Sequence, residues 1–215
     1  MAANGHFFNR KLHSLLGVIP VGAFLIVHLY SNFLATQGKE RYTEQVLALE
    51  KIPFLILVEI LFIFLPLLYH AVYGLYIAFQ AKHNVGNYGY LRNVLFFLQR
   101  LTGIVTLIFV VWHVWQTRVQ KALGNVEGAE FFDLMVDIFN NPFMVAFYAI
   151  GILSATFHFA NGMWSFLVSW GITVGPRAQQ ISTYVWIGFF IVLSYIGIMS
   201  MFAFINPVDV AAIKG

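Results

Sequence analysis

Five long apolar stretches constrain the fold of this chain more than any other feature. A helix needs about 20 mainly apolar residues to cross the hydrocarbon core of a bilayer, and each of these stretches is long enough. Hydrophobic residues make up 60% of the 215 residues and charged residues only 10%, a composition that excludes an ordinary water-soluble domain. We therefore expect an all-α integral membrane protein in which residues 1–215 form a single transmembrane domain. The predicted spans are 12–34, 53–79, 94–117, 142–169 and 181–205.

The charged residues flank these spans without fixing their orientation. Lys and Arg number six on each side of the predicted membrane, so the positive-inside rule is tied. Arg10 and Lys11 precede an apolar run that is too long for a signal peptide, and we keep that run as the first span. The net charge is only +3, and nothing in the sequence resembles a nucleic-acid-binding surface.

The sequence contains no cysteine. This absence excludes thiolate-held iron–sulfur clusters, thiolate zinc sites, disulfides and covalently attached c-type haem. Any metal must therefore be bound by histidine or oxygen.

Four of the seven histidines lie inside the predicted spans, one in each of the first four. From the rise of a helix, His28 and His113 lie about 24 to 28 Å from the N-terminal side of the membrane. His70 and His158, on the spans that return, lie about 14 to 17 Å from the same side. The sequence therefore predicts two depth-matched pairs, offset by about 10 Å.

The first four spans resemble a repeated helical hairpin. The two histidines of the first hairpin are 42 residues apart, and those of the second are 45 residues apart. The dipeptide Pro-Phe opens the second span at 53–54 and the fourth span at 142–143. These matches predict a weak internal repeat that forms a four-helix bundle, with cofactors held in its core by side chains of facing helices.

A glycine follows each histidine of the second pair by one helical turn, in the segments YHAVYGLY and FHFANGMW. Two imidazoles at one depth are the ligand set of a haem iron bound from both faces, and the planar macrocycle needs space beside it. We therefore expect two b-type haems, stacked in the bundle, with Gly74 and Gly162 as clearance residues. Gly17 and Gly103, near the starts of spans one and three, are expected to serve the same purpose.

Other interpretations of these residues stay open. A membrane-embedded histidine also forms hydrogen bonds between helices, and a set of histidines also builds a proton relay or a transporter site. Glycines in spans also serve close helix packing. The tryptophans are typical of interface anchors: Trp112, Trp115, Trp164, Trp170 and Trp186.

Four segments resemble one known family. They are residues 7–29 (FFNRKLHSLLGVIPVGAFLIVHL), 64–84 (FLPLLYHAVYGLYIAFQAKHN), 98–118 (LQRLTGIVTLIFVVWHVWQTR) and 141–179 (NPFMVAFYAIGILSATFHFANGMWSFLVSWGITVGPRAQ). Together they closely resemble the single-chain, dihaem cytochrome b membrane anchor of succinate:menaquinone oxidoreductase, respiratory complex II, of the Gram-positive bacterial type. The resemblance covers nearly the whole chain and includes the histidines, their flanking residues and the Trp-Gly-Ile-Thr that ends the fourth span.

The resemblance implies the haem ligands and the orientation in the membrane. It gives His28 with His113 and His70 with His158 as the axial ligands, the same pairs that the depth argument predicts. It places the N-terminus in the cytoplasm of a bacterial cell, where the flavoprotein and iron–sulfur subunits of succinate dehydrogenase would dock. The His70–His158 haem would then be proximal to the iron–sulfur subunit, and the His28–His113 haem distal.

The resemblance also implies a function in electron transport and the tricarboxylic acid cycle. Electrons from succinate would pass from a partner's flavin through iron–sulfur clusters and the two haems to menaquinone, or in reverse during fumarate reduction. The chain has no flavin fingerprint, so we expect a non-flavin subunit that does not act on succinate alone. The alternatives are a dihaem cytochrome b of another quinone-linked dehydrogenase, such as hydrogenase or formate dehydrogenase, and a haem-free transporter with buried histidines.

Polar residues near the ligands complete the predicted cofactor site. For the propionates of the proximal haem we name His13, Ser14 and Arg100, although basic residues here also anchor helix ends to phospholipid. Backbone carbonyls are the expected partners of the outward ring nitrogens of the axial histidines. Hydroxyl groups within a turn of the ligands are the second choice: Ser31, Ser154 and Thr156.

Two acidic features lie toward the far side of the membrane. Glu59 is the only carboxylate well inside a predicted span, so it is a candidate for proton acceptance at a menaquinone site near the distal haem. Snorkelling to the interface is the alternative. Segment 129–139, AEFFDLMVDIF, combines acids with large apolar residues at helical spacing. It is predicted to form a short interfacial helix on the outer face with no catalytic role.

Overall fold

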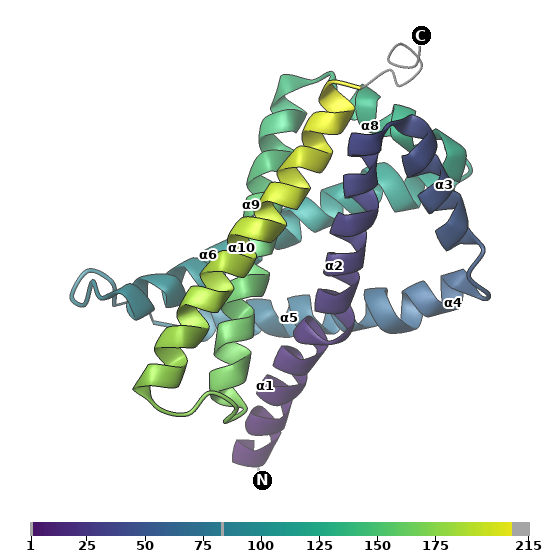
Figure 1. The fold of residues 1–215 in the computed structure, drawn as a ribbon. Helices are drawn as coiled ribbons and strands as arrows, with labels where there is room; N and C mark the ends of the chain where they lie inside the picture. Colours follow the sequence, from purple (N-terminus) through teal and green to yellow (C-terminus); the bar gives the residue numbers. More distant parts are fainter. Residues whose placement is uncertain (1, 83, 208–215) are drawn as a thin grey trace.

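The computed structural model of the protein describes residues 2–82 and 84–207, and every regular element in this part of the chain is a helix (Figure 1). Five helical segments are long and apolar enough to span a bilayer. The prediction of an all-α membrane protein with five transmembrane helices is therefore confirmed. The spans are Gly5–Gln37, Leu55–Gln80, Leu91–Ala122, Pro142–Ser169 and Pro176–Ile205.

The first span is interrupted near its middle. It consists of α1 (Ala2–Val18), α2 (Pro20–Phe33) and the 3₁₀ turn η1 (Leu34–Gln37). Proline has no backbone N–H, so Pro20 fits the first position of a helix and separates α2 from α1. The span ends at Gly38, whose φ of 104° is readily adopted by glycine, and α3 (Lys39–Glu50) follows.

The second span contains a π-helical turn. It consists of α4 (Leu55–Glu59), the π turn η2 (Ile60–Phe64) and α5 (Leu65–Gln80). The helix begins two residues after the predicted start at residue 53, because Phe54 adopts a left-handed φ of 54°. Pro66 follows the π turn and cannot donate to the carbonyl four residues earlier, which lies within that turn.

The third span contains a π turn near its end, and a short amphipathic helix follows this span. It consists of α6 (Leu91–Val114), the π turn η3 (Trp115–Val119) and α7 (Gln120–Ala122). Glu127 and Glu130 then form a capping box at the 3₁₀ turn η4 (Gly128–Glu130), which leads into α8 (Phe131–Phe139).

The last two spans are unbroken helices. Asn141 accepts a hydrogen bond of 2.9 Å from the backbone N–H two residues on, so α9 (Pro142–Ser169) starts at the predicted position. Gly175, with a φ of 86°, precedes α10 (Pro176–Ile205). This helix starts before the predicted residue 181. The prediction followed the apolar residues only, whereas the helix also includes the polar turn that precedes them.

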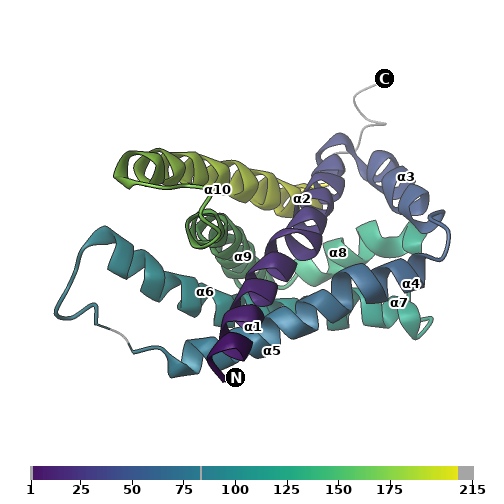
Figure 2. The same ribbon diagram turned by 90° about the horizontal axis from the view of Figure 1, so that it is seen from below.

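The spans are arranged around α9. Helix α9 packs along α6 and α10, while α1 contacts α5 and α9, and α2 contacts α10. The span of α4 and α5 runs across the span of α1 and α2 (Figure 1), and Figure 2 shows α10 covering one side of the assembly. The four histidine-bearing spans therefore meet in a crossed bundle, and the fifth span covers it.

A cluster of buried apolar residues lies at the end of the molecule away from the N-terminus, where α3, α8 and the end of α10 meet (Figure 1). The predicted helix at 129–139 is present as α8, but its apolar side chains are buried in protein rather than in lipid. Phe132 and Phe139 are 4% and 5% exposed and pack near Phe204. Burial in this cluster raises the pKa of Tyr42, so its hydroxyl stays protonated.

Candidate functional site

Two pairs of histidine rings face each other in the bundle. We call His28 on α2 and His113 on α6 the far pair, and His70 on α5 and His158 on α9 the near pair, by their distance from the N-terminal side. The ring centroids of the far pair are 5.7 Å apart, and those of the near pair are 6.0 Å apart. The ring planes are steeply inclined, by 73° and 83°. The rings that face each other in the structure are therefore those of the histidines that the sequence predicts to lie at the same depth.

These separations fit two imidazoles that share one iron. A bond of about 2 Å from each nitrogen to the metal, plus the distance from nitrogen to ring centre, separates the centroids by about 6 Å. In the described part of the chain, no group of three or more His, Asp or Glu residues could hold a bare metal ion. A porphyrin brings its own four nitrogens, so two axial imidazoles suffice for it. The donor set of each pair therefore fits haem b better than an ion held by protein alone.

Backbone carbonyls orient both rings of the near pair. The Nδ1 atom of His70 lies 2.9 Å from the carbonyl oxygen of His13, and that of His158 lies 2.9 Å from the carbonyl oxygen of Gln99. Donation to a carbonyl places the proton on Nδ1 and leaves the lone pair of Nε2 for a metal. These contacts agree with the expectation that backbone carbonyls orient the ligands.

A glycine lies one turn after each of these carbonyls. A Cβ atom on Gly17 would collide with the ring of His70, and one on Gly103 would lie 2.9 Å from Cε1 of His158. Helices α1 and α6 thus present the same unit, a carbonyl acceptor followed four residues later by a glycine, to the imidazole of the neighbouring helix. This unit repeats between the two hairpins and makes room for the near pair.

Gly74 and Gly162 make room for different atoms. The nearest atom to a Cβ on Gly74 would be Nε2 of His13, at 3.1 Å, and for Gly162 it would be Nε2 of Gln99, at 3.3 Å. These glycines therefore accommodate the side chains of residues 13 and 99. Their role in haem clearance stays a prediction.

Side chains rather than carbonyls surround the far pair. Nδ1 of His113 lies 3.3 Å from the hydroxyl oxygen of Tyr148, and the amide nitrogen of Asn32 lies 3.4 Å from Nε2 of His28. Phe109 stacks on the ring of His113 with centroids 5.7 Å apart. Sequence reasoning missed Tyr148, although a tyrosine at this depth in an apolar span was a signal that a partner for His113 lies on α9.

Of the three predicted propionate residues, His13 contacts the near pair. The ring of His13 stacks on His70, with centroids 4.1 Å apart and planes 7° apart. The hydroxyl of Ser14 donates to the Lys11 carbonyl and accepts a hydrogen bond from Trp170. The Arg100 guanidinium lies 3.5 Å from the centre of the Phe96 ring. Contact of any of these residues with a propionate stays a prediction.

The hydroxyl groups proposed as second-choice partners do not contact a ring nitrogen in the described residues. Thr156 bonds to the hydroxyl of Ser194 on α10 at 2.8 Å, and Ser31 accepts a hydrogen bond from Gln45. Ser154 has no hydrogen bond to a histidine. Thr156 and Ser31 bond toward α10 and α3 instead, and the first-choice carbonyls are the partners of both near rings.

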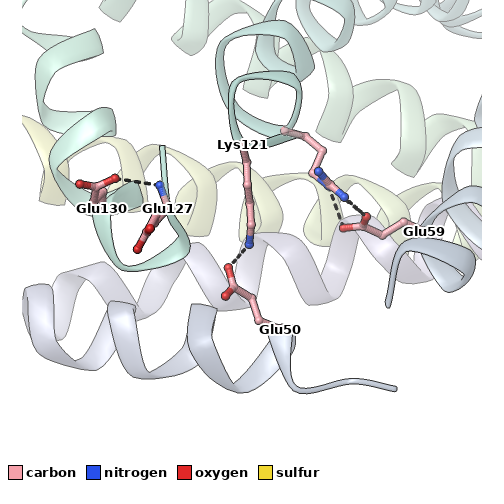
Figure 3. A network of polar contacts seen from close by, with 6 residues as sticks. Glu50, Glu59, Lys121, Glu127 and Glu130 are labelled. Atoms are coloured by element: carbon pink, nitrogen blue, oxygen red, sulfur yellow. Dashed lines mark hydrogen bonds and ion pairs between the residues drawn. The ribbon is translucent and has the colours of Figure 1, made fainter. Parts of the chain in front are cut away.

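Glu59 is held in an ion pair between two spans. Its carboxylate lies 2.7 Å from Nη2 and 3.0 Å from Nε of Arg118, and the two side chains are 17% and 28% exposed. Glu50 and Lys121 form a second ion pair beside it (Figure 3). Glu59 directly precedes η2, and Arg118 lies within η3; π turns are frequent at functional sites. The predicted role of Glu59 at a quinone site stays a prediction.

The fold and the paired rings define a class: a multi-pass, all-helical membrane subunit with four histidine-bearing spans and a fifth covering span. The chain belongs to the family of succinate dehydrogenase/fumarate reductase transmembrane subunits, whose family model matches residues 84–197. It is 55% identical over 205 residues to the succinate dehydrogenase cytochrome b558 subunit of Bacillus subtilis (strain 168), covering 95% of this chain and 100% of that relative. The family expected from the sequence is confirmed, and the chain is a membrane subunit of a succinate dehydrogenase complex.

Proposed function

We propose that this chain is the membrane anchor and electron conduit of a succinate:menaquinone oxidoreductase, with two b-type haems between an iron–sulfur subunit and menaquinone. The observation that carries this proposal is the pair of facing imidazoles at each of two depths, at separations that suit a shared iron. The name of the Bacillus subtilis relative, a cytochrome b558 subunit, supports haem b. When bound, such haems supply one-electron carriers inside the bilayer.

The residues of the chain hold and orient the ligand rings. Helices α2 and α6 supply His28 and His113, and helices α5 and α9 supply His70 and His158. The carbonyls of residues 13 and 99 fix the proton of the near rings on the nitrogen that faces away from the metal. His13, Ser14 and Arg100 are the proposed polar partners of the proximal propionates.

We assign the chemistry of menaquinone to the side of the membrane that lies nearer the far pair. Glu59 is the proposed proton acceptor near the distal haem, and its side chain pairs with the Arg118 guanidinium between spans two and three. Menaquinone takes up two protons when it is reduced, so Glu59 would pass a proton to it during succinate oxidation and would accept one from menaquinol during fumarate reduction.

The soluble partners are assigned to the N-terminal side, which faces the cytoplasm of a bacterial cell. The flavoprotein subunit would oxidise succinate, and the iron–sulfur subunit would deliver electrons to the His70–His158 haem. In this arrangement the chain alone does not act on succinate.

Copurification tests the proposed function. Affinity-tagged chain, expressed in its native membrane with its partners, should retain a flavoprotein and an iron–sulfur protein. Addition of succinate to this complex should reduce b-type haem, which is seen as the appearance of its α-band. A nickel or molybdenum protein in place of the flavoprotein would support a hydrogenase or formate dehydrogenase instead. Absence of a dithionite-reducible α-band from the gently purified complex would favour the haem-free transporter.

A further inference from the structure

The two histidine pairs differ in what orients their rings. Both near rings donate to backbone carbonyls, which no substitution of the carbonyl-bearing residue removes. In the far pair, the outward nitrogen of His113 faces a side chain, the hydroxyl of Tyr148. The orientation of the far pair is therefore open to change by a single side chain.

Tyr148 is rigidly held. Its side chain is 3% exposed, and its ring makes edge contacts with Phe109 and Phe139 at centroid distances of 5.2 and 4.9 Å. It lies on α9, the helix that also carries His158, so the same helix contributes to both pairs. A buried hydroxyl with a fixed ring has little freedom, so it fixes the direction of the hydrogen bond it accepts.

The hydrogen bonds around Tyr148 run in one direction. The Tyr148 hydroxyl donates to Oε1 of Gln116 at 3.3 Å, and the Gln116 amide donates toward the sulfur of Met144 at 4.0 Å. With its proton engaged, the Tyr148 oxygen accepts the Nδ1–H of His113 at 3.3 Å. This assignment leaves Nε2 of His113 as the metal-binding atom.

We propose that Tyr148 is a positioning residue that fixes the ring orientation and the electron donation of His113, and thereby sets the midpoint potential of the distal haem. This inference rests on the proposed function. An acceptor on Nδ1–H increases the electron density of the imidazole, which favours ferric over ferrous iron. Loss of that acceptor should therefore raise the midpoint potential of the distal haem alone.

The test is a redox titration of Tyr148→Phe in the intact complex, followed by optical and EPR spectroscopy of both haem components. The change in the ferric-to-ferrous ratio equals the difference in strength of this hydrogen bond between the two oxidation states, and the whole bond is worth about tenfold at most, so we expect a change of about twofold to tenfold at the distal haem. A tenfold change is about 59 mV for a one-electron couple. We expect this upward shift and an altered g value for the distal component, with the proximal component unchanged.

Two further variants separate positioning from a general structural effect. Gln116→Leu keeps the Tyr148 ring but removes the acceptor of its hydroxyl proton, so the distal midpoint should rise by a smaller amount. Tyr195→Phe removes a hydroxyl from a side chain that is 60% exposed on α10, and should shift neither component. If Tyr148→Phe releases the distal haem, Gln116→Leu carries the test.

The outcomes distinguish this inference from the proposed function. An unchanged distal midpoint in Tyr148→Phe with both haems bound, or an equal shift of both components, would overturn the role of Tyr148. If Tyr148→Phe has lost its distal haem, an unchanged distal midpoint potential in Gln116→Leu would overturn the role of Tyr148. Wild-type complex with fewer than two b-type components would instead overturn the proposed function.

Discussion

At the scale of single residues, the near pair depends on the absence of two side chains. The imidazoles of His70 and His158 lie against Gly17 and Gly103, where a methyl group would meet ring atoms. Each ring is also held by a carbonyl one turn earlier on the same helix, so it cannot move away without losing its hydrogen bond. The position of these rings is therefore specified by backbone atoms of the neighbouring helix.

Gly17→Ala should displace His70 and reduce the occupancy of the proximal haem by more than half, while the distal haem stays bound. The physical reason is the collision of the new methyl group with the His70 ring. Haem content per chain and the two components of a redox titration measure the effect. Gly188→Ala is the matched control, because no atom lies within 4 Å of the added Cβ there. Full proximal haem in Gly17→Ala would contradict the close contact.

The partners of the paired histidines were harder to predict than the histidine pairs themselves. Four histidines at matched depths in apolar spans are visible in the sequence because helix rise converts residue number into depth. Tyr148 was not predicted, because depth alone does not say which way a helix is rotated about its axis. The same limit applies to Thr156, whose hydroxyl turns toward α10.

At the scale of elements, spans two and three are joined by an ion pair at their π turns. Glu59 and Arg118 lie 59 residues apart, so neither sequence spacing nor hydropathy predicted their contact. The π turn η2 was also not predicted, because a segment as uniformly apolar as Ile60–Phe64 has no periodicity that would distinguish one helix type from another. Helix α8 was predicted as an amphipathic helix on the membrane surface, but its apolar face packs against protein because α3 and the end of α10 lie beside it.

Arg118→Gln should destabilise the protein by about 1–3 kcal/mol, because it leaves the mostly buried carboxylate of Glu59 unpaired; a fully buried pair costs about 3–5 kcal/mol to break. The double variant Arg118→Gln/Glu59→Gln should recover most of this loss. The temperature of half-maximal haem release in detergent measures the difference. Double-variant stability below that of Arg118→Gln would contradict the coupling.

An exposed ion pair provides the control for this experiment. Lys39 and Asp133 form an ion pair whose side chains are 49% and 58% exposed. Water and salt screen such a pair, so Lys39→Gln should change stability by less than about 1 kcal/mol.

At the scale of the whole molecule, alternating spans place the loop after α7 on one side of the membrane and the loop after α9 on the other. The equal numbers of Lys and Arg on the two sides of the membrane did not decide the orientation, and the family resemblance implies a cytoplasmic N-terminus. The chain has no cysteine, so a single introduced cysteine is the only thiol that a reagent can label on it.

A membrane-impermeant thiol reagent should label Asn125→Cys in intact cells and Val174→Cys only after the cells are opened. Val174 is 75% exposed, so poor access of the reagent does not explain protection. Labelling of Val174→Cys alone in intact cells would reverse the orientation and move the soluble partners to the other face.

The pairing of the four histidines across the bundle is the central claim, and a redox titration of single alanine variants tests it most directly. We predict that His28→Ala and His113→Ala remove one of two b-type components, and that His70→Ala and His158→Ala remove the other. Wild-type complex should contain two haems per chain. Loss of the same component from His28→Ala and His158→Ala would contradict the pairing.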